Sequence, residues 1–125
     1  MPRRADPFVA HCQDLLSGLG ETAARGMFGG WGLYLDGRIF ALVIDDRLYL
    51  KTDPETRPRF ESAGAAPFAY TTKDGRHTVM SYWTAPDEAM ESPDDLLPWA
   101  RLAVEASRRA GAGKPAGRRK TGSGP

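Results

Sequence analysis

The sequence contains few of the residues on which small enzymes and metalloproteins depend. Cys12 is the one cysteine among 125 residues, which excludes an internal disulfide and is typical of a reducing compartment. The two histidines, His11 and His77, do not combine with Cys12 in the spacing of a zinc site. No apolar run is long enough to span a bilayer, and the N-terminus lacks the apolar core of a secretion signal. We therefore expect a cytoplasmic protein without a metal or cofactor.

The sequence also has almost no excess of either charge, but its charges are unevenly distributed. Residues 111–125 contain no acid and four basic residues: Lys114, Arg118, Arg119 and Lys120. Without these four, 13 of the 17 basic residues remain against 16 acidic ones, so residues 1–110 have a net charge of −3. We expect one domain over residues 5–110 and a disordered basic tail. Direct DNA binding is not expected, beyond weak, salt-sensitive contact through that tail.

The first helix is predicted from its cap and its apolar stripe. Asp6 and the proline after it form a helix start, because the acid caps free N–H groups and proline suits the first position. Apolar residues then recur at helical spacing: Phe8, Val9, Cys12, Leu15, Leu16 and Leu19. Gly18 or Gly20 is expected to end the helix. Cys12 is interpreted as a buried hydrophobe, because the neighbouring His11 diverges from it by about 100° on a helix and cannot act as its base.

Two further helices and two groups of strands follow. Asp53-Pro54 predicts a short helix ending near Gly64, and Ser92-Pro93 predicts a helix to about Ala110. Strands are predicted over residues 26–35, 38–44 and 47–52, and then over 67–72 and 77–83. The turns between paired strands are expected at Asp36-Gly37, Asp45-Asp46 and Asp74-Gly75.

This order, α-β(3)-α-β(2)-α, predicts the α+β class: a two-layer sandwich with a mostly antiparallel sheet and helices packed on one face. The strand over residues 38–44 is apolar on both sides, which is typical of a central strand. One side is expected to face a helix layer, and the other side to face another covering.

The glycine-rich segment MFGGWG is the feature with two opposed interpretations. A phosphate-binding loop needs its glycines between a strand and a helix, whereas Gly29, Gly30 and Gly32 lead into a strand. We therefore interpret them as places where bulky groups approach closely. The candidate partner-binding surface is this segment, because methionine and aromatic side chains form adaptable contacts: Met27, Phe28, Gly29, Gly30, Trp31 and Gly32.

Other chemistry is not indicated. The acids fall mostly in turns and helix starts, where they have structural roles, and we nominate no catalytic residue. Tyr82 and Trp83 resemble residues on which single-stranded bases stack, but no basic residue is interleaved with them, so core packing is the preferred interpretation.

Several segments together resemble the N-terminal domain of the TfoX/Sxy family of bacterial competence regulators. They are RGMFGGWGLYLDGRIFALVIDDRLYLKTD, then PFAYTT followed by MSYW and a proline, and LLPWARLAVEAS. The resemblance covers nearly all of residues 5–110. It implies a two-layer domain and a role in the transcription of DNA-uptake genes through a promoter-bound activator. Full regulators of this kind carry a second, C-terminal helical domain, so we expect a single-domain form. No catalytic or metal-binding residue comes with the resemblance.

The preferred hypothesis is a non-enzymatic protein-interaction module that influences transcription through a protein partner. The alternative is a small adaptor or chaperone-like homodimeric domain unrelated to competence, suggested by the central strand that is apolar on both sides. An enzyme is the least favoured class, because no group of titratable residues stands out.

Overall fold

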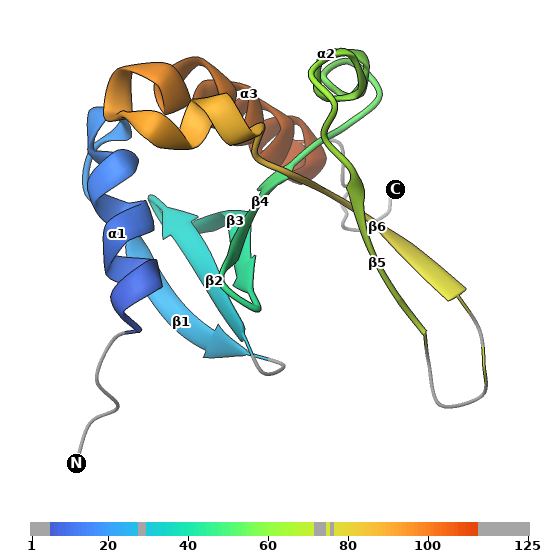
Figure 1. Cartoon of the computed structure of the whole chain (residues 1–125), viewed down its shortest axis with the longest axis horizontal. Helices are drawn as coiled ribbons and strands as arrows, with labels where there is room; N and C mark the ends of the chain where they lie inside the picture. The colour runs from blue at the N-terminus through green and yellow to red at the C-terminus, as the bar shows by residue number, and fades with distance from the viewer. Residues whose placement is uncertain (1–5, 28–29, 72–74, 76, 113–125) are drawn as a thin grey trace.

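A computed structural model describes residues 6–27, 30–71, 75 and 77–112. These residues form one antiparallel sheet of six strands in the order β1-β2-β3-β4-β6-β5, together with three α-helices (Figure 1). The elements are α1 (Pro7–Leu15), β1 (Ala23–Met27), β2 (Gly30–Leu35), β3 (Arg38–Ile44), β4 (Arg47–Lys51), α2 (Arg57–Ser62), β5 (Pro67–Thr71), β6 (His77–Thr84) and α3 (Pro93–Ala112), with 3-10 turns at Ser17–Leu19 and Asp87–Glu91. The predicted α+β class and antiparallel sheet are confirmed.

One strand prediction needs correction. Residues 26–35 were expected to form a single strand, but they belong to two strands, and Met27 of β1 pairs with Gly30 of β2. The observed order is therefore α-β(4)-α-β(2)-α. Ala23–Met27 was missed because its alanines, arginine and glycine lack the alternating apolar pattern of a strand. It is an edge strand held by backbone pairing to β2. The link between the two strands lies outside the described residues.

Two of the three predicted helix starts are confirmed by their caps, whereas α2 begins at Arg57 and not directly after Asp53-Pro54. Asp6 Oδ1 accepts a hydrogen bond of 2.7 Å from the Phe8 N–H at the start of α1. Ser92 Oγ accepts one of 3.1 Å from the Asp95 N–H at the start of α3. The last helix continues to Ala112, slightly past its predicted end. The predicted tail lies almost entirely outside the described residues and stays a prediction.

The predicted turns also have the required backbone conformation. Asp36 and Gly37 have φ values of 54° and 80°, and Asp45 and Asp46 have values of 51° and 58°. Positive φ at both central residues is the mark of the tight turn that matches the twist of paired strands. Gly75 has φ 86° between β5 and β6, while Asp74 lies outside the described residues.

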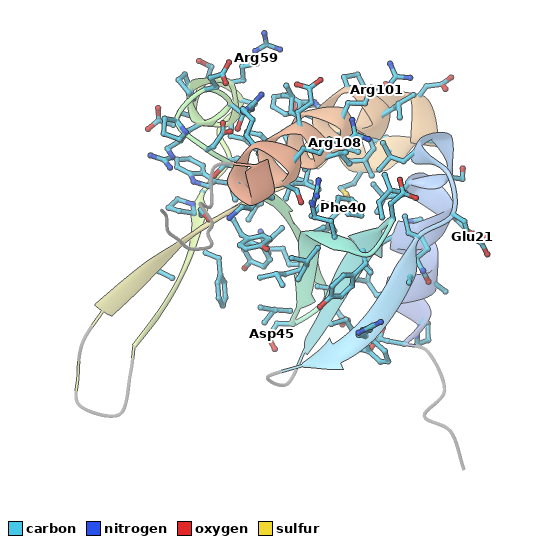
Figure 2. All side chains as sticks on the ribbon, turned by 180° about the vertical axis from the view of Figure 1, so that it is seen from behind. Glu21, Phe40, Asp45, Arg59, Arg101 and Arg108 are labelled. Carbon is cyan, nitrogen blue, oxygen red and sulfur yellow. The ribbon has the colours of Figure 1, made fainter. Side chains whose placement is uncertain are left out.

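The core lies between one face of the sheet and the layer of α1 and α3 (Figure 1). A bulge in the pairing of β2 with β3 leaves Phe40 opposite no partner, and Phe40 joins Ala41 and Val43 in the core. Figure 2 shows Phe40 directed toward α3. Trp83 is buried in this core, as predicted, and Trp31 packs partly buried against it.

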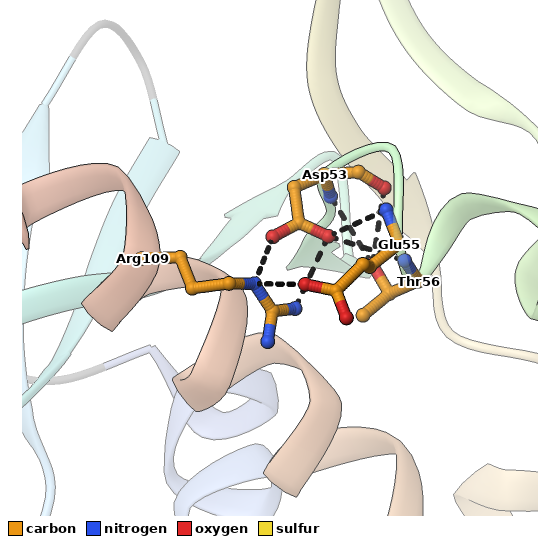
Figure 3. A network of polar contacts seen from close by, with 4 residues as sticks. All are labelled: Asp53, Glu55, Thr56 and Arg109. Atoms are coloured by element: carbon orange, nitrogen blue, oxygen red, sulfur yellow. Dashed lines mark hydrogen bonds and ion pairs between the residues drawn. The ribbon is translucent and has the colours of Figure 1, made fainter. Parts of the chain in front are cut away.

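An ion-pair network joins the end of α3 to the segment after β4 (Figure 3). Arg109 Nε lies 2.6 Å from Asp53 Oδ2 and 3.1 Å from Glu55 Oε2, and Arg109 Nη2 donates to Asp53 Oδ1 at 3.2 Å. Asp53 Oδ1 also accepts from the N–H groups of Glu55 and Thr56. The hydrogen bond from Arg109 is the main reason that the pKa of Asp53 lies below its usual value.

We predict that Arg109→Gln destabilises the protein at pH 7 and not in acid. A carboxyl group whose pKa is lowered by folding stabilises the native state above its unfolded pKa of 3.8, and this contribution disappears as the pH falls through the folded pKa. Urea unfolding of both proteins should therefore show a difference at neutral pH that shrinks below pH 3.8. A difference that stays constant with pH would show that Arg109 acts through packing. High salt should reduce the neutral-pH difference, because the arginine is exposed.

Candidate binding face

The described residues contain no metal-binding cluster and no reactive thiol. No three His, Cys, Asp or Glu side chains among them are placed to hold a metal ion. In the same part of the chain, no helix is long and apolar enough to cross a bilayer. His11 is exposed on α1, and the Cys12 side chain is buried in the core, as predicted. Burial raises the pKa of the Cys12 thiol to about 12, with a smaller contribution from the charge of Asp6. The thiol is therefore protonated at neutral pH and is a poor nucleophile.

We predict that Cys12 resists thiol reagents until the protein unfolds. Its side chain has no exposed surface and its raised pKa removes the reactive thiolate. Native protein incubated with a coloured disulfide reagent at pH 8 should react far more slowly than protein in denaturant. Rapid reaction of the native protein, at the rate of a free thiol, would contradict the core assignment.

The segment predicted to bind a partner is only partly visible. Phe28 and Gly29 lie outside the described residues, as does the side chain of Met27. Trp31 is directed to the helix side of the sheet, where it packs partly buried against the core. Gly32 is buried at its β2 position. Partner binding by this segment stays a prediction.

Gly30 supports the interpretation of close approach. A Cβ atom placed on it would lie 2.5 Å from the carbonyl oxygen of Val43 and 2.9 Å from Ile44 Cγ1. A side chain at this position cannot fit unless β2 and β3 move apart, because the nearest atom belongs to the backbone. The glycine therefore allows close pairing of these strands.

A second surface is formed by the face of the sheet that points away from α1 and α3. In Figure 1 no helix is drawn below the sheet, between β1–β4 and the β5–β6 hairpin. Alternation along each strand places one set of side chains there, because directly paired residues share a face. We give the name open face to the basic and aromatic members of this set together with Leu42: Arg25, Tyr34, Leu42, Arg47, Tyr49, Lys51, Phe68 and Tyr82.

Aromatic rings dominate the middle of the open face. Tyr49 of β4 and Phe68 of β5 meet edge to face, with ring centroids 5.0 Å apart. Tyr34, Tyr49 and Phe68 are each half-buried, whereas Leu42 and Tyr82 are 6% and 7% exposed and form the floor. Burial is the main reason that the pKa of the Tyr82 hydroxyl is raised. The charge of Tyr34, which lies on β2, raises this pKa further.

Cations lie directly on these rings. The Arg25 guanidinium carbon lies 5.2 Å from the centroid of the Tyr34 ring, and Lys51 Nζ lies 5.1 Å from that of Tyr82. Lys51 Nζ also donates a hydrogen bond of 2.7 Å to Ser81 Oγ. Attraction between a cation and an aromatic ring is worth about 0.5–1 kcal/mol at an exposed site such as Arg25 and more where the ring is buried, as Tyr82 is, so both cations are held on the face.

Sequence reasoning missed this face because its pairs are far apart in the chain. Basic residues near Tyr82 were sought in neighbouring positions, but its cation, Lys51, comes from another strand. The one local signal was the alternation of β4, in which Leu48 and Leu50 are buried while Tyr49 and Lys51 are only half-buried.

A small cavity of about 170 Å³ lies on the other side of the molecule, between the β2–β3 turn and the last turns of α3. Phe40 and Val104 line its apolar part, and Asp36, Arg38 and Arg108 line its polar part. Ser107, which also lines it, donates its hydroxyl to the carbonyl oxygen of Ile39 at 2.7 Å. The open face, which gathers aromatic rings and cations, is the candidate binding site.

Comparison with known proteins identifies the family. The model of the TfoX N-terminal domain matches residues 14–107. The DNA transformation protein TfoX1 of Aliivibrio fischeri is 37% identical over 90 residues, which are 72% of this chain and 43% of that protein. The matched region thus spans less than half of the relative's length. All six strands and most of α3 fall within the family match. The chain belongs to the TfoX family and carries its N-terminal domain.

Proposed function

We propose that this protein is a non-enzymatic interaction domain that helps to control DNA-uptake genes by binding a protein partner in the cytoplasm. Family membership supports the link to competence, and the name of the Aliivibrio fischeri relative refers to DNA transformation. The observation that carries the proposal is the open face. It offers aromatic rings and cations on one face of the sheet.

The chemistry of the open face favours a protein as its partner. Tyrosine and arginine are enriched at the residues that dominate protein–protein binding energy, and half-buried rings over an apolar floor lose little entropy when they are covered. Reading duplex DNA would instead need a helix with a basic surface for the major groove. The first turn of α3 contains Asp94 and Asp95, which repel phosphate.

Deletion and rescue of the gene test this function. In the bacterium that carries the gene, transcripts of the DNA-uptake genes and the frequency of natural transformation are measured with and without it. Both quantities should fall in the deletion strain and return when the wild-type chain is supplied. Unchanged transcripts and transformation under competence-inducing conditions would contradict the proposed function.

A further inference from the structure

We infer that the open face binds an extended, acidic segment of the partner protein, in which acidic side chains flank an apolar one. This inference rests on the proposed function and adds the chemistry of the partner. It follows from three features of the face: its positive charge, the distance between its cations, and the contact of those cations with its tyrosine rings.

The charge of the sheet is opposite to that of the domain around it. None of the six strands contains Asp or Glu, whereas Arg25, Arg47 and Lys51 all point to the open face. Residues 1–110 nevertheless carry 16 acids against 13 basic residues. The nearest acids along the chain lie outside the strands: Asp36, Asp45 and Asp46 are exposed in turns, and Asp53, two residues after Lys51, is paired with Arg109. A cationic surface on an acidic domain favours an acidic partner.

The separation of the cations predicts the length of the bound segment. Arg25 lies on β1 and Lys51 on β4, which is three strands away in the sheet. The backbone of Arg25 is in register with Tyr49, two residues before Lys51, but its guanidinium lies over Tyr34 and so is displaced toward the row of Lys51. Neighbouring strands are about 4.8 Å apart, so the two cationic groups are separated by about 14 Å along the surface. An extended segment advances about 3.3 Å per residue, so acids about four residues apart would reach both cations. In such a segment, the residue midway between the two acids points to the same side as they do and would contact Tyr49 and Leu42.

Occupation of the rings disfavours single-stranded nucleic acid. Bases bind by stacking on open ring faces. Arg25 lies over the Tyr34 ring and Lys51 lies over the Tyr82 ring, and Tyr82 is 7% exposed. Carboxylates can instead pair with these cations while the cations stay on their rings. The observations therefore favour an acidic peptide.

A matched pair of peptides tests the inference by fluorescence anisotropy. The first contains Glu-Ser-Phe-Ser-Glu, with all three recognised side chains on one side of an extended chain. The second contains Glu-Ser-Ser-Phe-Glu, with the same composition but the phenylalanine on the opposite side. The full chain should bind the first peptide more tightly than the second, and 0.5 M salt should weaken the binding. The Arg25→Glu/Lys51→Glu double variant should lose about tenfold or more in affinity, equivalent to about 1.4 kcal/mol.

The control variant is Arg101→Glu/Arg108→Glu, which makes the same change of charge at two exposed positions on α3 (Figure 2). It should bind the first peptide like the wild type. Because Lys51 also bonds Ser81, Arg25→Gln/Arg47→Gln provides a second test at two exposed positions, and circular dichroism checks that every variant is folded.

Four outcomes would overturn the inference. They are no binding of either peptide at millimolar concentration, equal binding of both, equal losses in the open-face and control variants, and tighter binding of a thymidine oligonucleotide that the open-face variant abolishes. Light scattering that shows a dimer dissociated by Arg25→Glu/Lys51→Glu would identify a second copy as the occupant instead. None of these results changes the outcome of gene deletion, so the inference and the proposed function fail separately.

Discussion

Replacing Phe60 by alanine is expected to lower the free energy of unfolding by about 3–5 kcal/mol, the usual cost of removing a buried aromatic side chain. Phe60 has no exposed surface and meets Trp99 of α3 edge to face, with ring centroids 5.0 Å apart. It is also the one buried residue of α2, a helix of six residues. Because a helix of this length is not stable alone, the packing of α2 against α3 depends on the Phe60 side chain. Urea unfolding followed by circular dichroism measures the loss.

The control for this prediction lies beside Phe60 on the same helix. Arg59 is exposed, so Arg59→Ala should change the free energy of unfolding by about 0.5 kcal/mol or less. A loss below about 1 kcal/mol in Phe60→Ala would show that α2 is not anchored through this ring.

The second large effect is expected at Gly30. In Gly30→Ala the new methyl group would meet the Val43 carbonyl oxygen at 2.5 Å, so β2 and β3 must separate or twist. Overpacking of this kind costs about 1–3 kcal/mol. Thermal and urea unfolding should both show the loss, and hydrogen exchange of the β3 amides should become faster.

Gly26 on β1 provides the matched comparison. No atom lies within 4 Å of a Cβ placed there, and its φ is not positive. Gly26→Ala should therefore leave stability unchanged or raise it by about 0.4–1 kcal/mol, because alanine reduces the freedom of the unfolded chain. Equal losses in the two variants would refute the interpretation that Gly30 is required by close strand pairing.

Local signals predicted much of the fold. The caps at Asp6 and Ser92 and the turns at Asp36-Gly37 and Asp45-Asp46 depend on residues within a few positions of one another, so the sequence displays them directly. The alternation of buried Leu48 and Leu50 in β4 is equally local.

Features that depend on distant partners were not predicted. β1 is an edge strand of small and polar residues, and only its pairing with β2 shows that it is a strand. The bulge at Phe40 depends on the register between β2 and β3, which a single sequence does not display. Because Phe40 turns to the core, it does not share a side of the sheet with Leu42, as strict alternation along β3 would require.

The candidate site was the least predictable part. The open face combines side chains from all six strands, and each of its cation–aromatic pairs joins two of them. Sequence reasoning instead selected the segment from Met27 to Gly32, in which Gly30 has a packing role and Trp31 packs against the core. Leu42, from the strand that is apolar on both sides, lies on the floor of this face.

The most direct test of the account is rescue of the deletion strain by surface variants. Transcripts of DNA-uptake genes are measured after supplying the wild type, Arg25→Glu/Lys51→Glu or Arg101→Glu/Arg108→Glu, each at equal cellular abundance. We predict that the wild type and the α3 variant restore the transcripts and that the open-face variant does not. Full rescue by a folded open-face variant would contradict the claim that this face of the sheet is the functional surface.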